Sequence, residues 1–115
     1  MDNIDYADFA KVEIRMGLIT AAEVPEGSEK VIKLTVNFGE NWGVKTIFGG
    51  IKQWYKPEEM VGKTLPFVVN LTPKKMGSLG FSEGMLMAVT TGEGVNEKPV
   101  LLEPKEKVKP GDKVV

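Results

Sequence analysis

The sequence predicts a small all-β protein: a barrel of five strands, one short helix between strands 3 and 4, and a C-terminal extension of short strands. Three observations indicate this class. Apolar and polar residues alternate with a period of two, turns rich in glycine or proline separate the alternating segments, and no segment keeps a helical period over several turns. A chain of 115 residues suffices for one core, so we expect a single domain.

Alternation predicts the first two strands. Residues 12–22 form the first, and one of its sides carries Val12, Ile14, Met16 and Leu18. A turn containing proline and glycine follows. Residues 30–38 alternate most clearly, with one side made of Ile32, Leu34, Val36 and Phe38. We expect both of these apolar sides to face the core.

The third strand, 44–48, follows a glycine-flanked turn typical of a hairpin. Residues 49–63 then lose the period of two. Pro57 suits a first helical position and two glutamates follow it, which predicts a helix of one to two turns. Lys56 stands where a capping Ser or Asp is usual, so this helix should lack a cap worth about 1 kcal/mol.

Residues 64–70 and 84–91 are the fourth and fifth predicted strands, and Pro66 is expected at an edge or a bulge because it cannot donate to a ladder. The barrel core should span about 8–92 and the C-terminal extension about 93–115. Five strands with a helix between the third and fourth is the order of an OB-fold, which binds oligonucleotides on one face and in flanking loops. Another small barrel is the rival interpretation.

The composition disfavours an enzyme. The chain has no cysteine and no histidine, which removes disulfides, the usual zinc sites, the common nucleophile triads and the commonest general base. We therefore expect no catalytic residues, metal or cofactor. No apolar run approaches the roughly 20 residues of a membrane helix, and the N-terminus is acidic, so we expect a cytoplasmic protein.

The charge is unevenly distributed although the net charge is only −1. Residues 1–29 hold seven acids and two bases, residues 30–75 hold eight lysines and three acids, and residues 76–115 hold five lysines and six acids. This pattern predicts either a local positive face from the central segment or lysines scattered in solvent.

Five segments in order resemble a known family: DYADFAKVEIRMGLI, EVPEGSEKVIKL, YKPEEMVGK, NLTPKK and SEGMLMA. They are similar to motifs of the tRNA-binding OB domain found at the C-terminus of many methionyl-tRNA synthetases, in endothelial monocyte-activating polypeptide and in small stand-alone tRNA-binding proteins. The resemblance implies a homodimer that binds the outer corner of tRNA by shape, largely independently of sequence and without catalysis. Two alternatives stay open: a chaperone-like or export-related peptide binder, and a docking module for an aminoacyl-tRNA synthetase.

Three lysines are the first candidates for RNA binding. Lys74 and Lys75 follow the fourth strand in a glycine-punctuated loop, where they either neutralise phosphates or form a solvated turn. Lys30 and Lys33 are expected on the second strand facing opposite ways, so at most one of them should reach RNA from the sheet. Lys30 matches the lysine of the family motif.

Four more candidates each have two interpretations. Ser82 and Met85 match family positions associated with RNA contact through a hydroxyl and a thioether, although Met85 equally fits the core. Asn70 either bonds RNA or braces the loop. Arg15, the only arginine, either binds phosphate or pairs with a nearby carboxylate. Three aromatic residues either stack on bases or, as we expect, pack on the barrel: Trp42, Trp54 and Tyr55.

Overall fold

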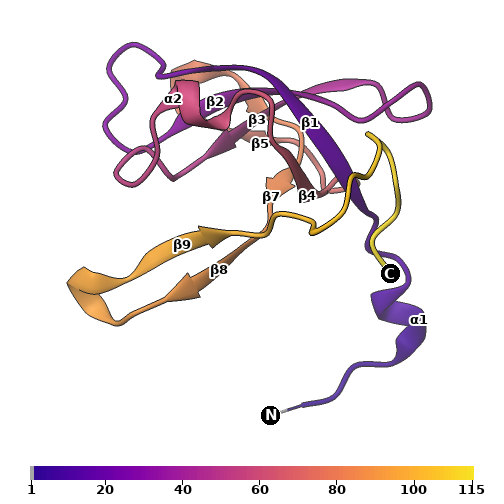
Figure 1. Ribbon diagram of the computed structural model, residues 1–115. Helices are drawn as coiled ribbons and strands as arrows, with labels where there is room; N and C mark the ends of the chain where they lie inside the picture. Colours follow the sequence, from indigo (N-terminus) through magenta and orange to yellow (C-terminus); the bar gives the residue numbers. More distant parts are fainter. Residues whose placement is uncertain (1) are drawn as a thin grey trace.

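The structure of the protein, a computed structural model, describes residues 2–115. Five strands form one antiparallel sheet in the order β3-β2-β1-β4-β7 (Figure 1). Their bounds are β1 Ile14–Glu23, β2 Ile32–Asn37, β3 Val44–Gly49, β4 Thr64–Val68 and β7 Met85–Leu86. A single helical turn, α2 (Pro57–Met60), stands between β3 and β4 in the chain.

The sheet closes where the segment before β7 meets β3. The Glu83 N–H donates to the Thr46 carbonyl at 2.8 Å, and the Thr46 N–H donates to the Glu83 carboxylate at 2.8 Å. The two edges of the sheet are thereby joined into a nearly closed barrel. The predicted five-stranded OB-fold barrel, with its short helix between the third and fourth barrel strands, is confirmed.

The core lies inside this barrel, and β2 contributes to it as predicted. Ile32, Leu34 and Val36 have no exposed surface, and Phe38 is 1% exposed. The Phe38 ring meets Phe67 of β4 edge-on, with ring centroids 5.4 Å apart. Full burial of one such side chain contributes roughly 1.5–3 kcal/mol.

The first strand is buried on both of its sides near its start, and not on one side as predicted. Gly17 and Ile19 face the core: Ile19 is fully buried, and a Cβ on Gly17 would overlap the Val36 side chain. Ile14 and Met16 are also buried, yet they lie outside the core cluster. A strand buried on both sides is apolar on both, so alternation alone does not tell which side faces the barrel.

The C-terminal segment 111–114 runs along this part of β1. The Val114 N–H donates to the Ile14 carbonyl at 2.9 Å, and the Met16 N–H donates to the Asp112 carbonyl at 2.8 Å. β2 pairs only with the second half of β1, which leaves this edge available. Part of the C-terminal extension therefore covers the edge of the barrel sheet beside β1.

The start of α2 is stabilised from within the helix. The Lys56 ammonium cannot accept a hydrogen bond, but the Glu59 carboxylate accepts one from the Lys56 N–H at 2.9 Å.

A further correction concerns Pro66, which lies in an inner strand and not at an edge. The opposite residue, Met16, donates its N–H to the Asp112 carbonyl at 2.8 Å and accepts at its own carbonyl from the Gly111 N–H at 2.7 Å, so β1 needs no donor from Pro66.

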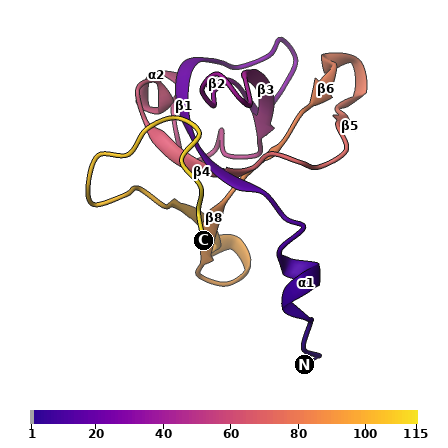
Figure 2. The same ribbon diagram turned by 90° about the vertical axis from the view of Figure 1, so that its right-hand side faces the viewer.

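The predicted fifth strand, 84–91, is also corrected, because it divides into two elements. Its first part is β7, and its second part, β8 (Ala88–Thr91), leaves the barrel to pair with β9 (Lys98–Leu101) in a projecting hairpin (Figure 1). The η2 turn, Gly94–Asn96, joins these two strands. The short α1 helix, Tyr6–Phe9, extends away from the barrel on the N-terminal side (Figure 2).

Neither a membrane span nor a metal cluster is found in the part of the chain that the structure describes. Across residues 2–115, none of the helices combines the length and the apolar character that crossing a bilayer requires. Within the same residues, no three acidic side chains gather in a way that would hold a metal ion.

Candidate nucleic-acid interface

The loop between β4 and β7 forms a small hairpin beside the barrel (Figure 2). Its strands are β5 (Lys74–Lys75) and β6 (Phe81–Ser82), joined by the η1 turn, Gly77–Leu79. The turn is closed by a hydrogen bond of 2.7 Å from the Met76 N–H to the Gly80 carbonyl. Gly77 and Gly80 have φ angles of +56° and +105°, which side chains disfavour, so both glycines are required by the turn.

The two adjacent lysines point to opposite faces of this hairpin. Lys74 pairs with Ser82 and Lys75 pairs with Phe81, and successive residues of a strand alternate between faces. Both lysines are exposed, and neither forms an ion pair with any residue in the described range 2–115. The hairpin therefore carries one positive charge on each face.

The Lys74 face borders a cavity of about 230 Å³ between the hairpin and the barrel. Met85 lines the same cavity and is 50% exposed, whereas its neighbour Leu86 packs against the core. Of the two interpretations of Met85, the structure favours an exposed contact residue. The full lining is Phe48, Leu71, Thr72, Lys74, Met76, Ser82, Gly84 and Met85.

The Ser82 hydroxyl holds the barrel together. Ser82 is 7% exposed; its Oγ accepts a hydrogen bond of 3.0 Å from the Phe48 N–H and donates one of 3.2 Å to the Gly84 carbonyl. This hydroxyl thus supplies a partner that the backbone of β3 lacks near the barrel closure. Its position beside Lys74 and Met85 makes it a support for the site.

Lys30 reaches the same hairpin from a distant part of the sequence. It precedes β2 and is not part of it, contrary to expectation. Lys52 stabilises the loop that precedes β2. Its N–H donates to the Lys30 carbonyl at 3.2 Å, and its Nζ donates to the Ser28 carbonyl at 2.9 Å. A cavity of about 590 Å³ lies between residues 26–31 and 76–79, and two acids, Glu26 and Glu29, share its lining with Lys30.

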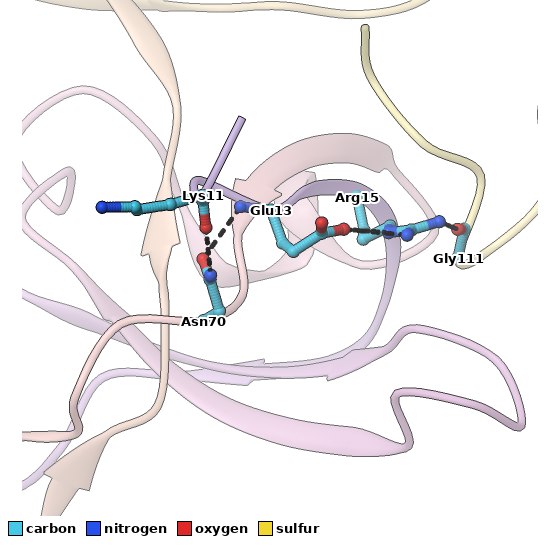
Figure 3. Close-up of polar contacts among 5 residues, drawn as sticks. All are labelled: Lys11, Glu13, Arg15, Asn70 and Gly111. Atoms are coloured by element: carbon cyan, nitrogen blue, oxygen red, sulfur yellow. Dashed lines mark hydrogen bonds and ion pairs between the residues drawn. The ribbon is translucent and has the colours of Figure 1, made fainter. Parts of the chain in front are cut away.

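Asn70 braces the chain at the start of the loop (Figure 3). Its Oδ1 accepts a hydrogen bond of 2.9 Å from the Glu13 N–H, and its Nδ2 donates one of 2.6 Å to the Lys11 carbonyl. The side chain thus joins the segment after β4 to the segment before β1. Its amide is committed to structural bonds, which favours the bracing interpretation.

Arg15 borders a cavity lined by residues 38–42 and 110–112, none of which belongs to the hairpin. Its polar contacts are drawn in Figure 3. Its Nε and one Nη donate to the Glu13 carboxylate at 3.1 and 2.8 Å, and its other Nη donates to the Gly111 carbonyl at 3.2 Å. The guanidinium carbon is 5.2 Å from the ring centroid of Trp42. The ion-pair interpretation of Arg15 is therefore the one that the structure supports.

The three aromatic residues mostly pack as expected. Trp42 and Tyr55 are partly buried against the core, whereas Trp54 is 39% exposed. The Tyr55 hydroxyl donates to the Pro99 carbonyl at 2.8 Å and so ties β9 to the barrel.

The structure adds one feature that sequence reasoning missed, a groove on the other face of the hairpin. Phe81 is 56% exposed there, opposite Lys75, and Lys33 of β2 lines the same groove. The only sequence signal was a phenylalanine flanked by glycine and serine in a polar loop. Lys30, Lys74, Lys75 and Met85 thus gather around one hairpin, with Ser82 beneath them.

Comparison with known proteins identifies the family. The family model described as "Putative tRNA binding domain" matches residues 14–113. The chain belongs to the tRNA-binding domain family. Among curated relatives, the methionine–tRNA ligase of Burkholderia ambifaria is 42% identical over 112 residues. The match covers 96% of this chain but only 15% of the ligase, so the similarity is confined to that part of the ligase.

Two solved structures of similar size have the same fold as this member of the tRNA-binding domain family. The MetRS related protein from Pyrococcus horikoshii is 39% identical, with a TM-score of 0.86, and the match covers 100% of both chains. The CsaA chaperone protein from Picrophilus torridus is 33% identical, with a TM-score of 0.84, covering 98% of this chain and 100% of that one.

Proposed function

We propose that this protein binds tRNA by shape and charge through the surface around the β5–β6 hairpin, and that it catalyses no reaction. The observation that carries the proposal is the meeting of three exposed lysines, Lys30, Lys74 and Lys75, at one hairpin of a tRNA-binding family domain. Each phosphate that a lysine neutralises releases condensed counterions, which provides affinity that falls with salt. Phosphate contacts carry no sequence information, so recognition depends on the shape of the RNA.

The other site residues have supporting roles in this proposal. Met85 packs its exposed thioether on a base or sugar at the Lys74 face. Ser82 and Asn70 hold the hairpin and its entry in place through the hydrogen bonds described above. Arg15 stabilises the C-terminal segment and takes no part in binding, because each of its three side-chain nitrogens already donates a hydrogen bond within the protein.

A titration of purified protein with unfractionated tRNA at about 50 mM and about 200 mM salt tests the proposal. Replacing Lys74 and Lys75 by alanine should weaken binding and reduce the slope of log affinity against log salt by about 1 for each lysine. The matched control replaces Lys105 and Lys107, which border a separate cavity beside Lys63 and carry the same charge. The control should keep the wild-type slope.

The outcomes separate two failures. If the Lys74→Ala/Lys75→Ala variant binds tRNA as the wild type does, the assignment of the hairpin is wrong. If the wild type itself does not bind tRNA at low salt, the proposal of tRNA binding is wrong.

The proposal includes a homodimer that works in the cytoplasm, where tRNA is used in translation. The β8–β9 hairpin supports the dimer, since an isolated two-stranded hairpin is marginally stable and its Val89 and Val100 are 47% and 38% exposed. An aminoacyl-tRNA synthetase is a proposed partner, because the matched relative is a methionine–tRNA ligase.

A second candidate function is binding of unfolded polypeptide. The similarity to CsaA chaperone structures and the exposed Met85 beside an apolar cavity support it. Binding that hardly responds to salt, together with displacement of RNA by an unfolded polypeptide, would favour this second function.

A further inference from the structure

A groove on the Lys75 face of the hairpin has no role in the function proposed above. The outward face of β2 and β3 contributes Lys33 and Thr46, and the hairpin contributes Phe81. The groove has a volume of about 570 Å³, within the roughly 300–1,000 Å³ of small-molecule sites. Its full lining is Lys33, Thr46, Pro73, Leu79, Phe81 and Glu83.

Phe81 presents its ring to this groove although no packing role requires it. More than half of its surface is exposed, at 56%, and it is absent from the core cluster. The backbone of β6 holds it there, because Phe81 pairs with Lys75 while the next residue, Ser82, is anchored to β3. The ring is therefore a preformed platform on a hairpin tied to the barrel.

The charges around the Phe81 ring favour a ligand with a neutral, flat group that stacks on the ring and with a phosphate on each side of that group. Lys75 lies on the ring's own face of the hairpin and has no ion-pair partner in residues 2–115. Within residues 2–115, Lys33 forms one ion pair, with Glu23 at 3.7 Å, and because both side chains are well exposed this weak pair exchanges readily. Glu83 within the groove repels a phosphate there but accepts hydrogen bonds from an amino group.

We infer that Phe81 is a stacking platform for one unpaired base of the RNA, with the flanking phosphates on Lys75 and Lys33. An aromatic ring beside basic groups is the usual arrangement for binding unstacked bases, since every base offers a flat face. The inference rests on the proposed binding of tRNA and deepens it. It adds a contact to a base to the contacts with phosphates.

The test compares Phe81→Ala and Phe81→Trp with the wild type in the tRNA titration at two salt concentrations. Loss of one stacked base should weaken binding about 5- to 150-fold. The salt slope should stay at the wild-type value because no phosphate contact is lost. Phe81→Trp should bind at least as well as the wild type.

A short single-stranded RNA containing 2-aminopurine should lose fluorescence on binding to the wild type and to Phe81→Trp, and should keep it with Phe81→Ala.

The control is Phe9→Ala, which removes a ring that is 47% exposed on the acidic α1 and should leave binding unchanged. Equal thermal unfolding of all variants shows that the fold is retained. If the wild type binds tRNA and Phe81→Ala binds it equally well, the stacking inference alone is overturned. If the wild type fails to bind tRNA, the proposed function fails with it. If Phe81→Ala instead abolishes binding of an unfolded polypeptide and leaves RNA binding intact, the groove is a peptide site and the inference is wrong.

Discussion

Ser82 shows at the scale of one residue how structure and site depend on each other. Its hydroxyl satisfies the Phe48 N–H of β3 and the Gly84 carbonyl, so a small polar side chain replaces part of a backbone ladder. The residue matches a family position associated with RNA contact, yet it is buried. Its effect on binding is therefore expected to come through the position of the hairpin.

Replacing Ser82 by alanine should lower the free energy of unfolding by about 1–3 kcal/mol, because the buried Phe48 N–H loses its acceptor. Urea unfolding measures this change. Ser78→Ala on the exposed η1 turn is the matched control and should change stability by less than about 0.5 kcal/mol. A Ser82→Ala protein as stable as the wild type would contradict the structural role.

The residue scale also shows what sequence patterns could not predict about the site. The pair Lys74 and Lys75 was identified from sequence, but only the register of the hairpin separates them onto two faces, one beside Met85 and one beside Phe81. Neighbours in sequence became members of two different surfaces. Phe81 was not identified because its exposure depends on that same register.

The C-terminal segment is the informative case at the scale of elements. Residues 111–114 extend the sheet beside β1 where β2 no longer pairs, and Arg15 holds them through the Gly111 carbonyl. Gly111 has a φ of +92°, and an added Cβ would lie 2.5 Å from the Phe38 carbonyl oxygen, so glycine is required here.

Deleting residues 111–115 should lower the free energy of unfolding by about 2–5 kcal/mol. Several backbone hydrogen bonds of roughly 0.5–1.5 kcal/mol each are lost, and the edge of β1 near Ile14 and Met16 becomes exposed. Urea unfolding provides the measurement. Removal of Val115 alone, which is fully exposed at 102%, is the control and should have little effect. Equal unfolding midpoints for the two truncations would show that the segment does not stabilise the barrel.

At the scale of the whole molecule, the β8–β9 hairpin projects from the barrel and packs only one of its faces against the core. Ala88 and Leu101 pair on one face, and Leu101 packs on the core, whereas Val89 and Val100 pair on the opposite face and are exposed. Exposed apolar pairs on a projecting element fit an interface with a second copy.

A charge on this face should therefore disrupt the proposed dimer. We expect light scattering to give twice the mass of one chain for the wild type and the mass of a single chain for Val89→Asp/Val100→Asp, because an unpaired carboxylate is costly to desolvate. Val44→Asp, at another exposed valine of the barrel, is the control and should leave the mass unchanged. A wild-type protein that is monomeric at working concentration would refute the dimer.

The sequence alone determined the fold class, because the period of two in β2, the glycine turns and the proline at the start of α2 are local signals with local causes. Five matching segments also pointed to the family to which the chain belongs. Only the tertiary structure decided which side of β1 faces the core, where the fifth strand divides, and which side chains share a groove. These features depend on contacts between residues far apart in the chain, such as Phe48 with Ser82 and Arg15 with Gly111, and a local pattern holds no information on such contacts.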